Sequence, residues 1–251
     1  LNKGKMIYER DNDDLHTNYF DEFIQNCKIV DRIISQTHSN ILLIGSYAVG
    51  RKKCVRITSS AKNYEQFSLS LTKDYSMKEF KKNIKDVFNI VTVENRVVLF
   101  IIEMHHIIQP EFMEYINSLL CSGEVPSLLS RDEQDSFLNQ LMNEFKEQNE
   151  YRTPYEFFIS RIRKNLKLCI LLDHDDKEFN QIILNNPALV TRCNVVWFNE
   201  LSEDTLKQLI KDELQSSFTL LQKSNIINEK DTTLIQQAMI DMYKATSNRS
   251  E

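Results

Sequence analysis

Two patterns of apolar residues alternate along the first 200 positions of the chain. Continuous apolar runs occupy residues 41–44 and 97–102, a third run over 166–172 is interrupted only by Lys167, and a shorter run covers 195–198. Runs that are apolar at every position are typical of strands buried on both faces of a parallel sheet. Residues 65–71 alternate between apolar and polar types, which predicts a further strand.

Between these runs, apolar residues recur every three or four positions, as on one face of an amphipathic helix. The predicted helices cover residues 15–36, 76–88, 110–120 and 130–164, and one more follows the turn after the first strand. Pro154 divides the longest of them, and Ser76 with Glu79 has the spacing of a capping box. Strands that alternate with helices predict an α/β fold, with a mainly parallel sheet flanked by helices.

The pattern changes near residue 200, where the apolar strands stop. Residues 202–218 and 230–244 have the spacing of two further helices. We therefore expect a large α/β subdomain over residues 1–200. Residues 201–251 would begin a helical small subdomain.

Composition limits the partners that this chain can have. Its 251 residues include 31 basic and 36 acidic side chains, a net charge of −5. This balance argues against a broad nucleic-acid-binding face and gives no attraction to anionic membranes. No apolar run approaches the roughly 20 residues of a spanning helix. The five cysteines are scattered without paired spacing, which predicts reduced thiols in a cytosolic protein: Cys27, Cys54, Cys121, Cys169 and Cys193.

The first strand ends in a candidate phosphate-binding loop. Its spacing and its place between a strand and a helix match the pattern G-x-x-x-x-G-K-[S/T]. In such loops the glycines let backbone N–H groups surround phosphates, and the next helix adds the partial positive charge of its N-terminus. An ordinary left-handed turn is the alternative interpretation. The residues predicted to contact a nucleotide here are Gly45, Ser46, Tyr47, Ala48, Val49, Gly50, Arg51, Lys52 and Lys53.

Two residues depart from that pattern. Arg51 stands at the lysine position and keeps the positive charge, but it is a planar fork instead of a point charge. Lys52 stands at the Ser/Thr position, which removes the hydroxyl that normally binds Mg²⁺ and puts a cation where the metal would lie. With Lys53 and Arg56 nearby, the loop could neutralise a diphosphate without a metal. We therefore expect no metal site and make Mg²⁺ a doubtful cofactor.

The strand over 97–102 ends in a second degenerate motif. Phosphate-hydrolysing loop proteins carry an Asp here for Mg²⁺, and many carry a Glu beside it to polarise water. Glu103 takes the first position, from which it could reach a metal or the loop, and Met104 takes the second. Loss of a general base costs about 10²- to 10⁴-fold in rate. The pair predicts little or no hydrolysis, the alternative for Glu103 being a carboxylate that caps the strand end.

Three further stretches carry a family resemblance. They are Ile116-Asn-Ser-Leu-Leu-Cys-Ser-Gly-Glu-Val-Pro126, Phe157-Phe-Ile-Ser-Arg-Ile-Arg-Lys-Asn-Leu166 and Asn186-Pro-Ala-Leu-Val-Thr-Arg-Cys193. In this order after the loop they resemble an AAA+ module of a dynein heavy chain, best the fourth module, which precedes the microtubule-binding stalk. The Gly-Arg-Lys loop ending and Glu103 are most similar to the intraflagellar-transport (second cytoplasmic) class.

The resemblance implies roles that the residues alone do not. It implies an AAA+ fold with ADP or ATP as cofactor, Asp173 as the polar sensor and Arg192 as an arginine finger for the preceding module's nucleotide. The segment from Met6 to Tyr8 would border the adenine. The implied partners are neighbouring AAA+ modules of the same chain, accessory chains, and microtubules through the stalk. The implied location is the cytoplasm and cytoskeleton, including the cilium.

Together these features predict a degenerate nucleotide-binding module with a structural and regulatory role in a motor ring. One alternative is a slow but genuine ATPase, in which Arg51 and Glu103 are functional substitutes. Another is a nucleotide-free scaffold, in which Tyr47 or Lys52 fills the pocket.

Other candidate groups have plainer readings. His105 and His106 are expected to be loop residues, and 173–176 a solvated acidic loop. The aromatic-rich stretch over 145–158 is expected to be core. The basic group Arg161, Arg163, Lys164 and Lys167 is expected to be a solvated helix end, unless it faces a neighbouring module.

Overall fold

A computed structural model describes residues 6, 9–10, 20–46, 49–69, 75–104, 110–223 and 229–247. The strands are β1 (Ile41–Gly45), β2 (Glu65–Ser68), β3 (Val98–Glu103), β4 (Leu166–Asp173) and β5 (Asn194–Phe198). The helices before β4 are α2 (Asp21–Ile34), α3 (Arg51–Ala61), α4 (Met77–Thr92), α5 (Pro110–Ser122), α6 (Arg131–Lys146) and α7 (Pro154–Asn165). Those after it are α8 (Phe179–Asn185), α9 (Ala188–Thr191), α10 (Glu203–Lys223) and α11 (Glu229–Ser247).

The five strands form one parallel sheet in the order β2-β3-β4-β1-β5, which confirms the predicted α/β class. β1 lies between β4 and β5, with Gly45 level with Asp173 on one side and Phe198 on the other. The chain leaves β1 toward α3 and leaves β4 toward α8, which belong to opposite layers of the molecule. Doubly wound sheets bind their ligands at the carboxyl ends of strands whose connections diverge in this way.

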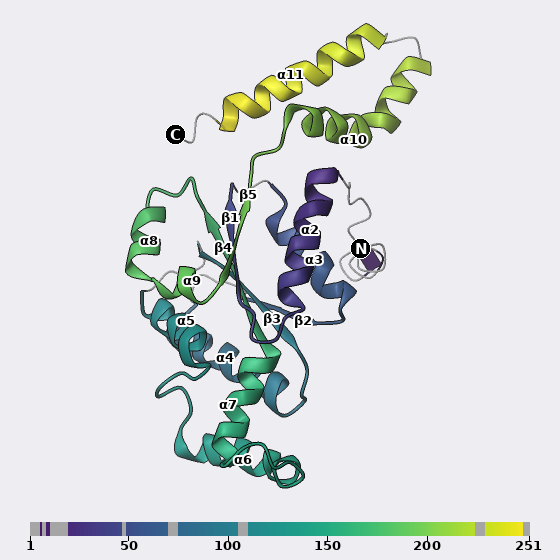
Figure 1. Cartoon of the computed structure of the whole chain (residues 1–251). Helices are drawn as coiled ribbons and strands as arrows, with labels where there is room; N and C mark the ends of the chain where they lie inside the picture. The colour runs from purple at the N-terminus through teal and green to yellow at the C-terminus, as the bar shows by residue number, and fades with distance from the viewer. Residues whose placement is uncertain are drawn as a thin grey trace.

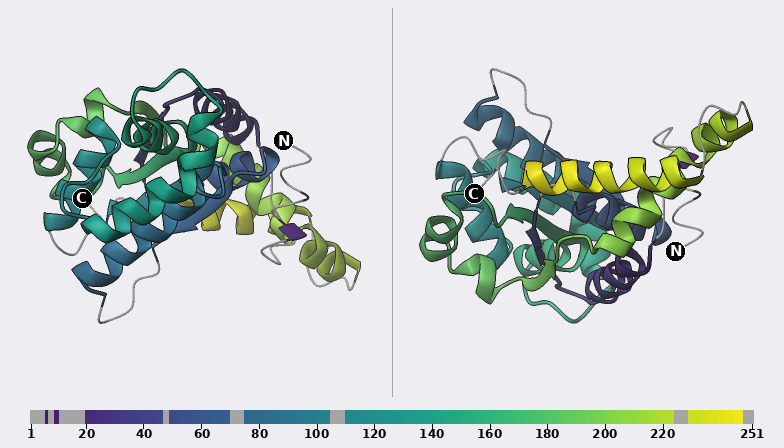
Figure 2. Two further views of the ribbon diagram at one scale, coloured as in Figure 1. Left: turned by 90° about the horizontal axis from the view of Figure 1, so that it is seen from below. Right: turned by 90° about the horizontal axis from the view of Figure 1, so that it is seen from above.

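Alternate strand residues pack against two separate helical layers. Leu43 and Leu99 face the layer formed by α2 and α3, whereas Leu42 and Phe100 face the layer of α4, α5 and α7. Because side chains alternate along a strand, strands buried on both faces are apolar at every position. Figures 1 and 2 show the sheet between these layers, with α6 outside α7.

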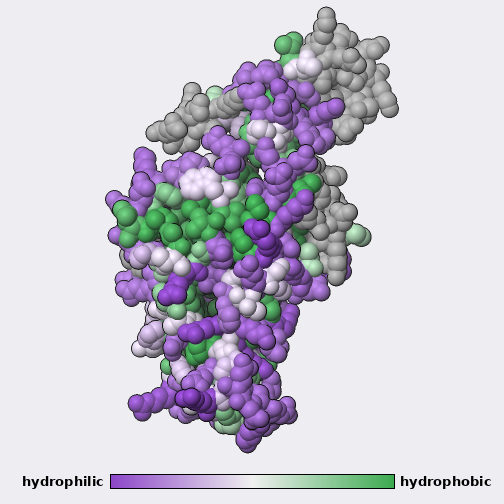
Figure 3. Space-filling model, in the orientation of Figure 1, coloured by the Kyte–Doolittle hydropathy of each residue, from purple (hydrophilic) through white to green (hydrophobic). Residues whose placement is uncertain are grey.

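β5 is an edge strand with one exposed apolar face. Val195 is 44% exposed and Trp197 is 50% exposed. In Figure 3 apolar side chains gather in a band across this side of the molecule, over α8 and β5. Such a contiguous band is typical of a surface that contacts another protein.

Two helices, α10 and α11, follow β5, as predicted. Figure 1 shows α10 and α11 beside each other beyond β5, and the two helices contact one another. The division into residues 1–200 and 201–251 stays a prediction. Among the described helices, none is both long enough and apolar enough to cross a bilayer.

Candidate functional site

Gly45 allows the loop after β1 to begin close to β5. A Cβ atom at this position would lie 2.6 Å from the Phe198 carbonyl oxygen and 2.9 Å from the Phe198 Cβ. Both distances are shorter than those at which Cβ atoms contact other atoms in proteins. The Phe198 carbonyl oxygen is a backbone atom and cannot rotate away as a side chain could. A residue without a side chain is therefore required where β1 and β5 pair.

Replacing Gly45 with alanine is expected to lower the free energy of unfolding by about 3 kcal/mol, because the new methyl group would push β5 away from β1. Urea unfolding followed by circular dichroism measures the change. Ser68→Ala, at an exposed position of β2, is the control and should stay within about 0.5 kcal/mol of the original chain. Equal midpoints for the Gly45 variant and the control would contradict the close approach.

Gly50 turns the loop into α3. Its φ of 82° lies in the left-handed region, and the Phe23 ring comes within 3.4 Å of where its Cβ would be. The Gly50 carbonyl accepts the first helical bond from the Cys54 N–H at 2.9 Å. Ser46 is half-buried and Val49 is buried against the α2–α3 layer, whereas Tyr47 and Ala48 lie outside the described residues.

Arg51, the first residue of α3, is buried with only 4% of its surface exposed. Its Nη1 donates to the Leu172 carbonyl at 2.6 Å and to the Leu43 carbonyl at 3.4 Å. Its Nη2 forms an ion pair with Asp173. The buried Nε has no acceptor in the described part of the chain. Arg51 therefore ties the start of α3 to the end of β4 and keeps one buried donor unused.

Lys52 forms the second ion pair of the site. Its ammonium donates to Glu103 Oε1, which joins α3 to the end of β3. The Glu103 side chain is 11% exposed and the Lys52 side chain 41% exposed. Glu103 therefore reaches the loop, one of the two roles expected for it. Met104, the next residue, is buried in the core beside α4 and α5.

These residues fit a phosphate better than a metal. The unused Nε of Arg51 is a buried donor that needs an acceptor, and the N-terminus of α3 adds partial positive charge. A Lys ammonium has three donors, of which Glu103 takes one. A divalent ion at the Lys52 position would instead meet a like charge and a carboxylate that is already neutralised.

Arg192 lies at the amino ends of the strands, opposite the carboxyl ends that carry the loop. It follows α9 and precedes β5, whose first residue, Asn194, is level with Ile41 at the start of β1. The rise along β1 puts roughly 13 Å between that edge and Gly45. The side chain is exposed, and no carboxylate of the described residues pairs with it. Arg192 is thus remote from the loop of its own chain.

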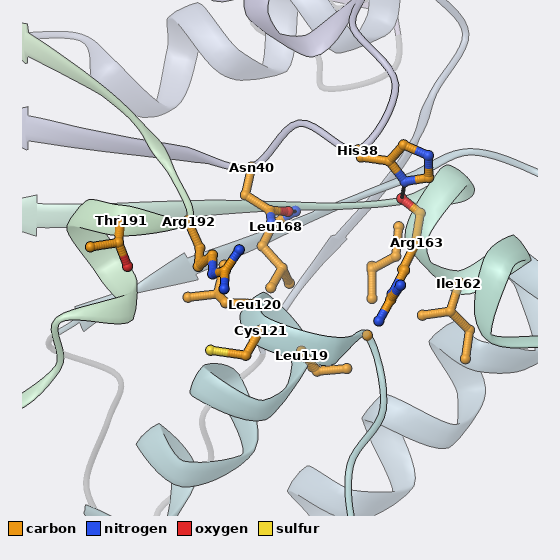
Figure 4. A pocket seen from close by; sticks show the side chains of 12 residues that line it. His38, Asn40, Leu119, Leu120, Cys121, Ile162, Arg163, Leu168, Thr191 and Arg192 are labelled. Carbon is orange, nitrogen blue, oxygen red and sulfur yellow. Dashed lines mark hydrogen bonds between the residues drawn. The ribbon is translucent and has the colours of Figure 1, made fainter.

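Arg192 shares a cavity of about 450 Å³ with Arg163 and His38. Figure 4 shows these side chains around the cavity, where β1, β4 and β5 begin. No acidic side chain belongs to the described lining. Sequence reasoning did not pair Arg163 with Arg192. The sequence did contain a signal for this pairing, since Arg163 precedes β4 and Arg192 precedes β5. The amino ends of parallel strands lie at the same end of a sheet.

The expected solvated helix end is wrong for two of the basic residues. Arg161 donates to the Thr92 carbonyl at 2.7 Å and pairs with Glu144. Lys167 is buried and donates to the Gln36 carbonyl. Burial lowers the pKa of Lys167 to about 8. Both cations hold elements of the fold together.

The remaining candidates give no further site. Asp175 and Asp176 are exposed, as expected of a solvated loop, whereas Asp173 is half-buried and paired with Arg51. Phe157 and Phe158 are buried core residues, as expected, but Tyr155 of the same stretch is exposed. Within the described ranges, no three His, Cys, Asp or Glu side chains lie close enough together to hold a metal ion. The predictions for 105–106 and for 7–8 fall outside the described residues.

All five cysteines are free, as predicted. Burial raises the pKa of Cys54, the fourth residue of α3, and hydrogen bonding to Cys27 raises it further. Burial also raises the pKa of Cys169, and raises that of Cys193 to about 12. These thiols stay protonated at neutral pH and give the site no nucleophile.

Comparison with known proteins agrees with this geometry. Residues 16–251 match the family described as P-loop containing dynein motor region D4. The chain is 32% identical to cytoplasmic dynein 2 heavy chain 1 of Tripneustes gratilla, over 83% of this chain and 5% of that protein. The human protein of that name is 30% identical over the same shares. That of Chlamydomonas reinhardtii is 30% identical over 96% of this chain and 6% of its own length.

The chain thus spans about one-twentieth of the length of these relatives. The match includes the phosphate loop, the sheet and the segment that carries Arg192. This chain belongs to the dynein motor family as a P-loop AAA module of the D4 region.

Proposed function

We propose that this module binds ADP or ATP at the loop after β1, hydrolyses ATP little or not at all, and serves a structural and regulatory role in a dynein motor ring. The ion pair between Lys52 and Glu103, beside the buried Met104, carries the proposal. This pair stands where an active module keeps its metal and its catalytic carboxylates.

Binding is supported by the surroundings of the loop. Gly45 and Gly50 give the backbone the freedom that the turn needs, and α3 begins directly after them. The buried Nε of Arg51 lacks an acceptor among the described residues, and a phosphate oxygen would supply one. We place the nucleotide-binding residues at 45–53, with Glu103 and Asp173 holding the two cations.

Slow hydrolysis follows from two independent losses. Met104 has no group that accepts a proton, and a missing general base costs about 10²- to 10⁴-fold in rate. The Glu103 carboxylate accepts a hydrogen bond from the Lys52 ammonium, and this ion pair competes with any role in orienting water.

We assign the opposite edge of the sheet to a neighbour. Arg192 and Arg163 line one cavity with no acidic side chain in its described lining, which suits an anion supplied by another module. In this proposal Arg192 is the finger for the preceding module's nucleotide, and the apolar band over β5 contacts protein. The proposed wider setting is a dynein of the cytoplasm or cilium. Neighbouring modules and accessory chains would be its partners, and it would reach microtubules through a stalk.

The proposal is tested by the nucleotide content and turnover of the 251-residue chain. Acid denaturation of the purified chain, or titration of the emptied chain with fluorescent ADP, should reveal one adenine nucleotide site. Phosphate release from ATP should be at background and equal in the Glu103→Gln variant. Circular dichroism checks that each variant is folded.

The two alternatives predict different results. A slow ATPase would release phosphate above background and would lose that turnover in Glu103→Gln. A nucleotide-free scaffold would release no nucleotide on denaturation and would not bind the fluorescent probe under any condition.

A further inference from the structure

We infer that the Lys52 ammonium, held by Glu103, takes the place of the metal ion in this phosphate site, so that the module binds a nucleoside diphosphate without Mg²⁺. This inference rests on the proposed nucleotide binding and specifies how the charge of the phosphates is balanced.

The first step is positional. In phosphate-loop proteins Mg²⁺ lies between a hydroxyl on the second residue of the helix and a carboxylate at the end of another strand of the sheet. In this chain those positions are Lys52 and Glu103, and their charged atoms contact each other directly. The cation that joins α3 to β3 is therefore a side chain of the protein, Lys52, and not a bound metal ion.

The second step is the supply of donors. Glu103 uses one of the three ammonium donors of Lys52, which leaves two for phosphate oxygens. Lys52 keeps 41% of its side-chain surface exposed, so a ligand can reach it. The buried Nε of Arg51 adds a donor one residue earlier. Lys52 can thus contact Glu103 and a phosphate at the same time, as a metal ion bound to a carboxylate would.

The third step is charge. A divalent ion on one carboxylate leaves a net charge of +1, whereas Lys52 on Glu103 leaves none. Arg51 is likewise balanced by Asp173. The partial positive charge at the N-terminus of α3 then offsets the charge of the ligand. A site with so little net positive charge favours ADP over ATP, whose further phosphate adds negative charge.

The experiment is a titration of the 251-residue chain with fluorescent ADP, in EDTA and in excess Mg²⁺. The Kd of the original chain should change by less than about threefold between the two buffers. Lys52→Thr restores the hydroxyl of the usual loop. Its Kd should rise at least tenfold in EDTA, about 1.4 kcal/mol, and recover on addition of Mg²⁺. Lys62→Met, at the other end of α3, is the matched control and should behave like the original chain.

Glu103→Gln should change the affinity for ADP in the opposite direction to the change expected at a metal site. Gln keeps the shape and an acceptor for Lys52 but removes the negative charge beside the phosphates. The affinity for ADP in EDTA should therefore rise several-fold, whereas in a site that needs Mg²⁺ the same change removes a metal ligand and weakens binding.

Three outcomes are decisive. Binding that is independent of Mg²⁺ in the original chain, and dependent on it in Lys52→Thr, supports the replacement. Binding of the original chain only with Mg²⁺ overturns the replacement and leaves the proposed function standing. No binding in either buffer overturns the proposed function itself.

Discussion

Replacing Arg192 with alanine is expected to slow ATP hydrolysis at the preceding module of a heavy chain that carries this one, on the order of 10³-fold. Arg192 is exposed at the amino edge of the sheet, remote from the phosphate loop of its own module. Arginine fingers act by neutralising charge that develops on the transferred phosphoryl group. Binding of ADP by this module should therefore not change.

The measurement is a single-turnover assay with labelled ATP, in which the ratio of bound ATP to ADP is followed over time. Arg192→Lys should be nearly as slow as the alanine variant, because a point charge does not reproduce a planar fork. Arg131→Ala, an exposed arginine at the start of α6, is the control. Decay of bound ATP at the original rate in Arg192→Ala would refute the assignment.

Phe80→Ala is expected to reduce the free energy of unfolding by about 4 kcal/mol. The Phe80 side chain is fully buried between α4 and α5. Its ring stacks on that of Phe112, with the centroids 4.4 Å apart, and meets the Tyr115 ring edge-on. Removing it leaves a cavity in a rigid aromatic cluster that cannot collapse. Small domains have only about 5–15 kcal/mol of net stability, so the loss is a large share.

Urea unfolding of the 251-residue chain checks this prediction. Leu184→Ala is the control, because that side chain is 79% exposed and its loss should cost less than about 0.5 kcal/mol. A Phe80→Ala midpoint close to that of the control would mean that α4 and α5 contribute little to the core.

The elements that sequence reasoning found are those whose burial is complete on both faces. β1, β3 and β4 are apolar at nearly every position because two helical layers cover them, Lys167 being the one charged residue inside the predicted runs, and their ends differ from expectation by one residue at most. The capping box is also present, with the Glu79 carboxylate accepting from the Ser76 N–H at 2.8 Å. β2 ends at Ser68, earlier than residue 71. For β1, β3, β4 and the capping box a local pattern was sufficient, whereas for β2 it was not.

Sequence reasoning missed α8 and α9 because neither shows the spacing of an amphipathic helix. α8 has seven residues, none of them fully buried, and α9 has only four. Short helices of this kind are held by their neighbours, as by the bond from Asn117 to Asn186 at 2.8 Å, and not by their own periodicity.

The site was predictable by position but not by partner. The two motifs at strand ends identified Arg51, Lys52 and Glu103, and the family resemblance added Asp173. Which cation meets which carboxylate depends on strand order, because β4 adjoins β1 whereas β3 lies one strand farther away. That order is set by the packing of helices far apart in the sequence, which no local motif records.

The position of β1 has a mechanical consequence. Hydrogen bonds to β4 and β5 hold this strand on both sides, so it can neither stretch nor slide alone. A displacement of the loop after β1 is therefore transmitted along this strand to its amino end, where Arg163 and Arg192 line a cavity. Under the function proposed above, this rigidity lets the module transmit movement to its neighbours without hydrolysing ATP itself.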